Sequence, residues 1–403
     1  MSTVLVLNAG SSSLKYQLVN PESGEVLAVG LVERIGLPEG KIKHEVGDKE
    51  YEVTTPIADH AIALEKVLEL FKEHGPNLDE AGIVAVGHRV VHGGTKYSEP
   101  VIIDDDLIKG VTELVPLAPL HNPANITGIE AARKLFDVPQ VAVFDTAFFS
   151  TLPPEAYTYA IDKDVAEKYQ IRRYGFHGTS HKYVSEKVAE ILGRKDLKIV
   201  VLHLGNGASA SAVVNGQAVD TSMGLTPLEG LVMGTRSGDL DPAIVFHLER
   251  VGKMSMDDVD NLLNKKSGMV GLTGGKSDMR EVHTAIDNGD KDAKTALDVY
   301  IHRLAKYVGG YAAVMDGIDV LVFTAGVGEN DSVVREELVK RLGYLGLHID
   351  TDKNSVRSKQ PRAISPDADI AKFDAGRGPI VMVVPTNEEL AIAQQSVAAL
   401  NAR

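Results

Sequence analysis

Two glycine- and serine-rich segments of this chain carry the kinds of groups that bind phosphate. The first, residues 8–15 (NAGSSSLK), lies between apolar runs at 4–7 and 14–19, which predict two strands joined by a tight turn. Such a turn offers clustered backbone N–H groups, hydroxyls and one lysine. A shift of 197 positions aligns it with a second segment, residues 202–209. One such turn is common, but two at near half-chain spacing predict a duplicated domain that holds one phosphate chain from both sides.

Three side chains that can carry positive charge or donate hydrogen bonds stand in glycine-rich segments: Arg89, His177 and Arg236. In segments with little strand character, chain geometry presents side chains more than it packs them. We therefore interpret these three residues as candidate functional groups. His121, in a proline-containing segment, belongs with them more weakly.

Two pairs of histidines are spaced four residues apart, His88 with His92 and His177 with His181. On a helix this spacing can bind zinc, but neither pair has the glutamate of the H-E-x-x-H motif, and glycines flank both. For His88, His92 and His181 two interpretations stay open: hydrogen-bonded structural histidines, or functional groups.

Carboxylates at two places complete the set of candidates. Asp145 directly follows an apolar strand predicted at 141–144, and ligands of open α/β sheets gather at such strand ends. The alternative is that Asp145 caps the next turn. Near the C-terminus, Thr386 and Glu389 have the spacing of a capping box at a helix start. Glu388 is not needed for that cap and is the freer candidate for a metal ion.

Two further segments match nucleotide-binding motifs only in part. Gly275-Lys276-Ser277 would end a P-loop, but Val270 stands where the first glycine belongs, and no buried strand precedes it. The segment 326–330 follows an apolar strand, but Asp331 replaces the third glycine of a dinucleotide motif. A helix is predicted to start at Asp331 or Ser332, and its N-terminus favours anions, so 326–330 remains a candidate nucleotide contact.

Apolar periodicity predicts alternating strands and helices along the whole chain, which indicates an α/β architecture with two related halves. The expected helices are 61–72, 126–135, 180–192, 295–314 and 388–400, and the expected strands beyond the first hairpin are 141–144, 318–323 and 380–384. Leu152-Pro153-Pro154 is the best candidate for the boundary between the halves.

The composition narrows the classes of protein to consider. A length of 403 residues with 44% hydrophobic residues suits two or three globular domains. A net charge of −14 and 5% aromatics argue against nucleic-acid binding, which uses basic surfaces and stacking platforms. No apolar run approaches the ~18–20 residues of a membrane span, and the first residues lack a signal peptide's charged region. The absence of cysteine fits a reducing cytoplasm, where we expect the protein to work.

Nine segments, in order along essentially the whole chain up to residue 390, together resemble the acetokinase family. They are NAGSSSLK, GHRVVHGG, APLHNP, FDTAF, YGFHGTSHKYV, HLGNGAS, GLTPLEGLVMGTRSGD, FTAGVGEN and PTNEEL. The resemblance implies an α/β fold of two duplicated actin-like, ribonuclease H-like domains around a nucleotide cleft, as in sugar kinases and heat-shock ATPases. It implies an N-terminal domain at 1–150 with 386–403 packed back onto it, and a nucleotide-binding domain at 151–385.

The resemblance also implies an activity and roles for single residues. Family members transfer the γ-phosphoryl group of ATP directly to acetate, giving acetyl phosphate and ADP, with Mg²⁺ or alternatively Mn²⁺. Arg89 and Arg236 match the family's active-site arginines, with Arg89 also holding the acetate carboxylate, and His177 matches the histidine that stabilises the transition state. Asp145 matches an aspartate that orients an arginine or a water. The magnesium positions correspond to Asn8 and Glu388.

The substrate contacts implied by the resemblance fall in three segments and one apolar pocket. The nucleotide contacts are His203, Leu204, Gly205, Asn206, Gly207, Asp278, Met279, Arg280, Gly326, Val327, Gly328, Glu329 and Asn330. The pocket around the acetate methyl group is Val91, Leu120, Phe176 and Pro227. Family members are homodimers, and we expect the two halves of each chain to close around ATP and acetate.

Two alternatives remain at this stage. A kinase acting on propionate would share nearly every motif, because one methylene changes discrimination by only ~1–3 kcal/mol. The second alternative is a nucleotide-dependent binding module without catalysis, since proteins with the same fold also serve as switches. Five residues that a switch would not need argue against it: Arg89, Asp145, His177, Arg236 and Glu388.

Overall fold

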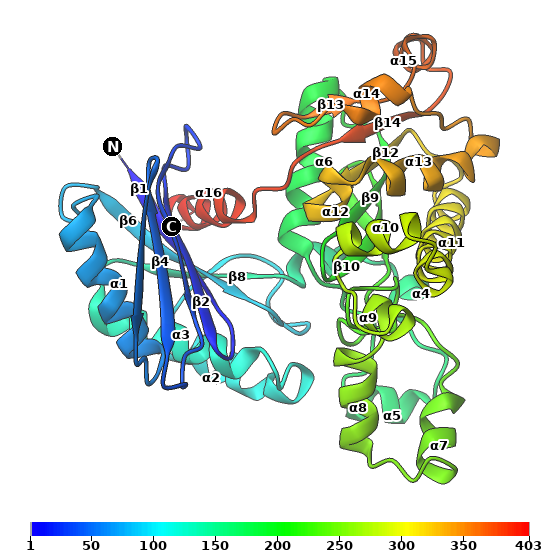
Figure 1. Cartoon of the computed structure of the whole chain (residues 1–403). Coiled ribbons are helices and arrows are strands. Elements are labelled where there is room, and N and C mark those ends of the chain that lie inside the picture. The colour runs from blue at the N-terminus through cyan, green and yellow to red at the C-terminus, as the bar shows by residue number, and fades with distance from the viewer. Residues whose placement is uncertain (1, 403) are drawn as a thin grey trace. The chain divides into compact units, whose positions relative to one another are not determined.

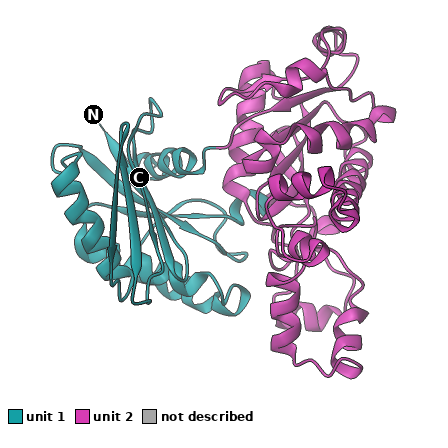
Figure 2. Cartoon of the chain, in the orientation of Figure 1, with its two compact units in different colours: residues 1–150, 387–403 teal, residues 151–386 magenta. Residues whose placement is uncertain are grey.

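The structure is a computed structural model that describes residues 2–402. The chain divides into two compact units, with junctions between Ser150 and Thr151 and between Thr386 and Asn387 (Figure 2). Unit 1 comprises residues 1–150 and 387–403, and unit 2 comprises residues 151–386. Each unit is a mixed α/β domain around one sheet of its own.

Unit 1 contains eight strands and the C-terminal helix of the chain (Figure 1). Its strands are β1 (Thr3–Ala9), β2 (Ser13–Val19), β3 (Val26–Glu33), β4 (Gly40–Val46), β5 (Lys49–Thr55), β6 (Ile83–Val90), β7 (Val101–Ile102) and β8 (Gln140–Phe144). Its helices are α1 (His60–His74), α2 (Asp105–Glu113), η1 (Val115–Leu117), α3 (Asn122–Leu135), η2 (Ala147–Thr151, which ends one residue into unit 2) and α16 (Glu388–Asn401).

The unit 1 sheet has the strand order β5-β4-β3-β2-β1-β6-β8-β7 and is covered on both faces. On one face, Leu5 and Leu7 share a core with Leu64 and Phe71 of α1. On the other, Val4, Val6 and Val143 pack against Ile392 and Ala393 of α16. Alternate residues of β1 thus enter opposite cores, as a strand between two helical layers requires.

Unit 2 contains six strands and most of the helices. Its strands are β9 (Lys198–Leu204), β10 (Ala208–Val214), β11 (Gln217–Thr221), β12 (Val320–Thr324), β13 (Arg362–Ala363) and β14 (Ile380–Val383). Its helices are α4 (Pro154–Tyr157), α5 (Lys163–Lys168), α6 (Gly178–Leu192), α7 (Ala243–Arg250), α8 (Met256–Lys265), α9 (Gly268–Thr273), α10 (Met279–Asp287), α11 (Lys291–Val314), α12 (Ala325–Asn330), α13 (Ser332–Lys340), η3 (Gly343–Leu345), α14 (Thr351–Ser355) and α15 (Asp367–Asp374).

The two sheets contain the same five-strand core. In unit 1 the order is β3-β2-β1-β6-β8, and in unit 2 it is β11-β10-β9-β12-β14. In both, the first three strands of the unit pair antiparallel, and two later strands (β6 and β8 in unit 1, β12 and β14 in unit 2) add in parallel on the other side of the first. One topology built twice explains the repeated hairpin, and it is the architecture expected of two duplicated actin-like domains.

The spacing of the repeat differs from the predicted 197 residues. Strands β9 and β10 begin and end 195 positions after β1 and β2. Because side chains alternate with a period of two along a strand, a slip of two residues leaves every apolar residue on its face. The sequence pattern therefore could not distinguish the two alignments.

The predicted helices and strands are present, with ends displaced by at most four residues. The sequence analysis did not place the antiparallel strands β3–β5 or the short helices α7 and α8. No helix described within residues 2–402 combines the length and apolar character needed to cross a bilayer.

Candidate active site

Three of the predicted residues lie together at one edge of the unit 1 sheet. Asn8 is near the end of β1, Arg89 is near the end of β6, and Asp145 directly follows β8. These strands are parallel neighbours, so their carboxyl ends meet at the same edge. Residues far apart in sequence thereby come within hydrogen-bonding distance.

Arg89 and Asp145 form a two-pronged ion pair. Nε of Arg89 donates to Oδ1 of Asp145 at 3.1 Å and Nη2 donates to Oδ2 at 2.5 Å, while Nη1 lies 3.4 Å from Oδ1 of Asn8. The Asp145 side chain is 1% exposed. Burial alone would lower the pKa of Arg89, but the negative charges of Asp145 and Glu388 outweigh burial and raise it. Asp145 therefore fixes the orientation of a permanently charged guanidinium.

Glu388 is the first residue of α16 and completes this cluster. Its Oε1 atom is buried and has no hydrogen-bond partner among residues 2–402. Burial raises the pKa of its carboxyl to about 7, with Arg89 opposing and Asp145 adding to the rise. A buried carboxylate oxygen without a partner costs free energy, so this atom is suited to a ligand that the protein itself does not supply.

The capping box predicted for Thr386 and Glu389 is wrong. The helix begins one residue later, and its N-cap is Asn387, whose side chain accepts from the backbone N–H of Leu390 at 3.0 Å. The hydroxyl of Thr386 instead lies 2.8 Å from the hydroxyl of Ser180, and Glu389 pairs with Lys15. Asparagine caps a helix as well as threonine does, so the sequence allowed both starts.

In unit 2, His177 stands at the N-terminus of α6 with a backbone φ of +57°. This left-handed conformation is costly for a residue with a Cβ and is maintained only where the surroundings impose it. Nδ1 of His177 lies 2.9 Å from the hydroxyl of Ser209, and its ring stacks on His203 with centroids 4.3 Å apart. The imidazole is therefore held in one orientation.

Arg236 faces the same small space as His177. A Cβ placed on Gly207 would lie 3.5 Å from Nη1 of Arg236 and 3.5 Å from Nε2 of His177. Nη1 of Arg236 donates to the backbone oxygen of Pro227 at 3.4 Å, and the described part of the chain places no carboxylate against this guanidinium. Burial lowers the pKa of Arg236. A half-buried cation without a counter-charge beside a glycine is a place for an anion.

The other paired histidines have structural surroundings. His88 lies within β6, and its Nε2 is 2.6 Å from Oε1 of Gln140. Nδ1 of His92 accepts from the N–H of Gly94, and His181 lies between two serine hydroxyls at 2.7 Å. Burial lowers the pKa of His88 and of His92 to about 4, and it also holds the pKa of His181 well below its usual value. These imidazoles are neutral at pH 7 and serve packing and hydrogen bonding.

A cavity of about 730 Å³ lies within unit 2, beside the turn at 205–207 that Arg236 and His177 face. Eight of the predicted nucleotide contacts line it: Gly205, Asn206, Asp278, Met279, Arg280, Gly326, Val327 and Asn330. Four of the remaining five make other contacts or lie in the core. Nδ1 of His203 lies 2.8 Å from the hydroxyl of Ser180, and Leu204 is fully buried in β9. The backbone oxygen of Gly328 accepts from Arg335, and the carboxylate of Glu329 accepts from two backbone N–H groups. The fifth, Gly207, lies beside Arg236 and His177.

The segment 326–330, a partial dinucleotide motif by sequence, is helical. Residues Ala325–Asn330 form α12, and α13 follows with Asp331 as its N-cap, as predicted for that helix start. Glycines in a sequence motif indicate backbone freedom but do not exclude a single helical turn. The segment Gly275-Lys276-Ser277 follows helix α9 rather than a strand, so it lacks the setting of a P-loop.

The residues predicted to form an apolar pocket lie in both units. In unit 1, Val91 is buried after β6, whereas Leu120 is 58% exposed between η1 and α3. In unit 2, Phe176 is buried next to His177, and Pro227 lies in the irregular segment that leads to Arg236.

Comparisons with known proteins identify the family. The model of the acetokinase family matches residues 3–394. An acetate kinase of Clavibacter michiganensis subsp. michiganensis is 55% identical over 402 residues, 99% of each chain. One from Streptomyces avermitilis is 56% identical over 401 residues, 98% of this chain and 96% of the relative.

This chain belongs to the acetokinase family.

Solved structures agree with this assignment. The Porphyromonas gingivalis acetate kinase is 44% identical with a TM-score of 0.93, covering 99% of this chain and 100% of its own. A propionate kinase from Francisella tularensis subsp. tularensis is 43% identical with a TM-score of 0.90, covering 98% and 99%. The fold is therefore the actin-like ATPase fold of this family, and the chain is a kinase that acts as an acetate kinase. Acetate kinases use ATP and ADP.

Several residues that line the cavity of this acetokinase family member were not predicted. They are Gly234, Met269, Ser277, His283, Tyr300, Asp331, Ser332, Val333 and Arg357. Asp331 and Ser332 had a signal, because a helix start was predicted there. Tyr300 and Arg357 had none, because a cavity wall assembled from segments far apart in the chain leaves no local pattern in the sequence.

Proposed function

We propose that this enzyme moves the γ-phosphoryl group of ATP directly and reversibly onto acetate, in line, giving acetyl phosphate and ADP. The observation that carries this proposal is the half-buried Arg236 without a counter-charge, which faces the same space as His177 beside Gly207. A carboxylate is already a nucleophile at neutral pH, so no strong general base is required. Catalysis then rests on positioning and on neutralising the charge of the transferring group.

We assign roles to four residues on this basis. Arg89, held by Asp145, binds the acetate carboxylate and contributes positive charge to the transferring group. Arg236 offers its unpaired guanidinium to the phosphoryl oxygens. His177 donates a hydrogen bond to an equatorial oxygen of the transition state, and its contact with Ser209 keeps the ring oriented for this. Positively charged and hydrogen-bond-donating groups around a phosphoryl group stabilise the negative charge that such transfers spread over its oxygens.

Asn8 and Glu388 would hold Mg²⁺, or alternatively Mn²⁺. The fit rests on the chemistry of the donors: the buried Oε1 of Glu388 lacks a partner among residues 2–402, and Asn8 adds an amide oxygen in the same cluster. Mg²⁺ prefers oxygen ligands and uses few of them from the protein because it keeps several waters. The ion would neutralise charge on the nucleotide phosphates.

ATP and ADP fit the cavity of unit 2. Its volume suits a small-molecule cofactor, and its wall includes the N-terminus of α13, where backbone N–H groups favour anions. We assign the nucleotide contacts to the eight predicted residues that line it and the phosphate side to the turn at 205–207. The other predicted contacts, His203, Leu204, Gly328 and Glu329, would support this wall from behind or from beside it.

The choice of acetate over propionate is tested by trapping the acyl phosphate with hydroxylamine. With ATP and Mg²⁺, kcat/KM should be highest for acetate and lower by roughly 10-fold or more for propionate, because one methylene in an apolar pocket is worth ~1–3 kcal/mol. Butyrate should react more slowly still. A higher kcat/KM for propionate would favour the propionate kinase alternative, and no hydroxamate with any acid would favour a binding module.

We also propose that the enzyme is a homodimer that works in the cytoplasm. Helix α7 supports a subunit interface: none of its eight described residues is buried, although four of them are large and apolar, and Phe246 is 51% exposed. Exposed apolar surface of this kind marks interaction sites.

In light scattering after size exclusion, Phe246→Glu should reduce the measured mass from that of two chains to that of one chain. Tyr344→Glu, at an exposed aromatic residue on η3, is the control and should leave the mass unchanged. A wild-type mass of one chain would contradict the proposal.

A further inference from the structure

Between β11 and α7, residues 222–242 are all described and form neither helix nor strand. A connection of this length without secondary structure is unusual inside a compact domain and is commonly functional. Here it carries both Pro227 and Arg236. Yet its middle is part of the core, since Leu231, Val232 and Met233 are at most 3% exposed. Something other than regular secondary structure must therefore hold it in place.

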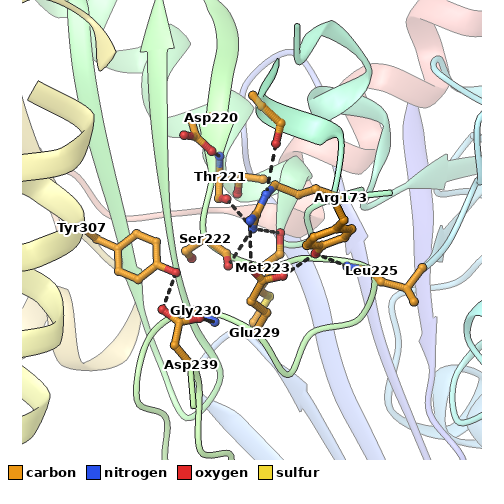
Figure 3. Close-up of polar contacts among 12 residues, drawn as sticks. Arg173, Asp220, Thr221, Ser222, Met223, Leu225, Glu229, Gly230, Asp239 and Tyr307 are labelled. Atoms are coloured by element: carbon orange, nitrogen blue, oxygen red, sulfur yellow. Dashed lines mark hydrogen bonds and ion pairs between the residues drawn. The ribbon is translucent and has the colours of Figure 1, made fainter. Parts of the chain in front are cut away.

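Arg173 is the centre of the contacts at the start of this segment (Figure 3). Its Nη1 donates to the backbone oxygens of Thr221, Ser222 and Met223 at 3.1, 3.2 and 3.4 Å. Its Nη2 donates to Glu229 at 2.8 Å. A single guanidinium thus joins the end of β11 to Glu229, eight positions beyond it, with a planar set of donors that lysine cannot reproduce.

Tyr159 closes this network. Its hydroxyl donates to Glu229 and accepts from the N–H of Leu225 at 3.1 Å. A Cβ on Gly224 would lie 2.0 Å from this hydroxyl and 1.8 Å from Oε2 of Glu229, so only glycine fits inside the network. The backbone between 221 and 229 is therefore fixed at several points.

The same network reaches the segment that carries His177. The N–H groups of Tyr174 and Gly175 donate to the backbone oxygen of Gly224 at 3.0 and 3.3 Å. Arg173 directly precedes these residues, and Phe176 and His177 directly follow them. Side-chain and backbone contacts thus tie two segments together, one ending in Phe176 and His177 and the other leading to Pro227.

We infer that Arg173, Glu229 and Tyr159 form a positioning network that sets the separation of Phe176 and Pro227 and thereby the length of carboxylic acid that the enzyme accepts. This inference rests on the proposed function, in which Phe176 and Pro227 contact the acyl chain. None of the three network residues needs to touch the substrate. They act by holding two irregular segments in a single arrangement, and small displacements of such segments are costly to catalysis.

The test compares the same substitution at two arginine hubs of unit 2. Arg173→Lys should raise KM for acetate roughly 10-fold and lower the preference for acetate over propionate several-fold, with KM for ATP within about two-fold of wild type. The control is Arg335→Lys. Arg335 is 1% exposed and donates to Asn354 and to the backbone oxygen of Gly328 beside the cavity. It should raise KM for ATP and leave the acid preference unchanged.

A milder variant, Tyr159→Phe, removes one hydroxyl and guards against misfolding of the lysine variant. It should shift the acid preference in the same direction by a smaller factor. An unchanged preference in both Arg173→Lys and Tyr159→Phe, or an equal change in Arg335→Lys, would overturn the inference.

Hydrogen exchange gives a readout that does not depend on activity. Amides in 174–177 and 222–230 should exchange faster in Arg173→Lys than in wild type, while those in 326–330 should not. Unchanged exchange in both segments overturns the positioning network even if the enzyme is an acetate kinase. A wild type that forms no acyl phosphate defeats the proposed function instead, and the exchange data still report whether the network holds the two segments.

Discussion

Replacing Arg236 with alanine should lower kcat for acetyl phosphate formation by roughly 10³-fold or more, since arginines that face a transferring phosphoryl group contribute ~10³–10⁵. Arg89→Ala should lower kcat by a similar factor. Trapping with hydroxylamine measures both. Lysine at either position should rescue poorly, because it restores the charge without the planar set of donors.

The two alanine variants should differ in stability. Arg236 has no carboxylate against it in the described chain, so its loss should hardly change the melting temperature. Removing Arg89 leaves the buried Asp145 charge uncompensated, and breaking a buried ion pair costs about 3–5 kcal/mol. Near-wild-type turnover of a folded Arg236→Ala or Arg89→Ala enzyme would refute the role that we assign to that arginine.

Glu388→Ala should sharply raise the concentration of Mg²⁺ needed for half-maximal rate and cripple turnover, because it removes the carboxylate with the unpartnered oxygen. Its neighbour offers a matched control. Glu389 pairs with Lys15, which is 47% exposed, and such partly exposed pairs contribute about 0–1 kcal/mol. Glu389→Ala should therefore cost little stability and little activity. The reverse order in magnesium titrations would show that our assignment of the ligand is wrong.

The pH dependence of the magnesium requirement tests the same carboxyl. Burial raises the pKa of Glu388 to about 7. The protonated form prevails below that pH and cannot bind the cation, so Mg²⁺ must displace a proton there. The magnesium requirement of the wild type should rise as the pH falls below about 7, and saturating Mg²⁺ should restore the rate. A requirement that does not change between pH 6 and pH 8 would contradict this.

The local pattern of apolar and polar residues in the sequence determined much of the fold. The apolar runs at 4–7 and 141–144 became β1 and β8, and the run at 318–323 became β12, because a strand covered on both faces needs a continuous apolar stretch. Long amphipathic helices such as α11 were predictable for a similar reason. The nine ordered motifs were sufficient to indicate the acetokinase family. Within each of these signals, the residues lie only a few positions apart in the chain.

Tertiary structure decided what depends on contacts between distant residues. Thr386 and Asn387 were equal as caps by type, and the contact of Thr386 with Ser180 accompanies a helix start at Glu388. Histidines with the same spacing differ because burial keeps His181 neutral while the left-handed backbone of His177 turns its ring toward Gly207. The pairing of Arg89 with Asp145 and the orphaned oxygen of Glu388 arise only when β6, β8 and α16 meet. Residue type and spacing specify which chemical groups are available. Burial, local charge and hydrogen-bond satisfaction depend on the tertiary surroundings of each side chain. These three properties distinguish a functional side chain from a structural one.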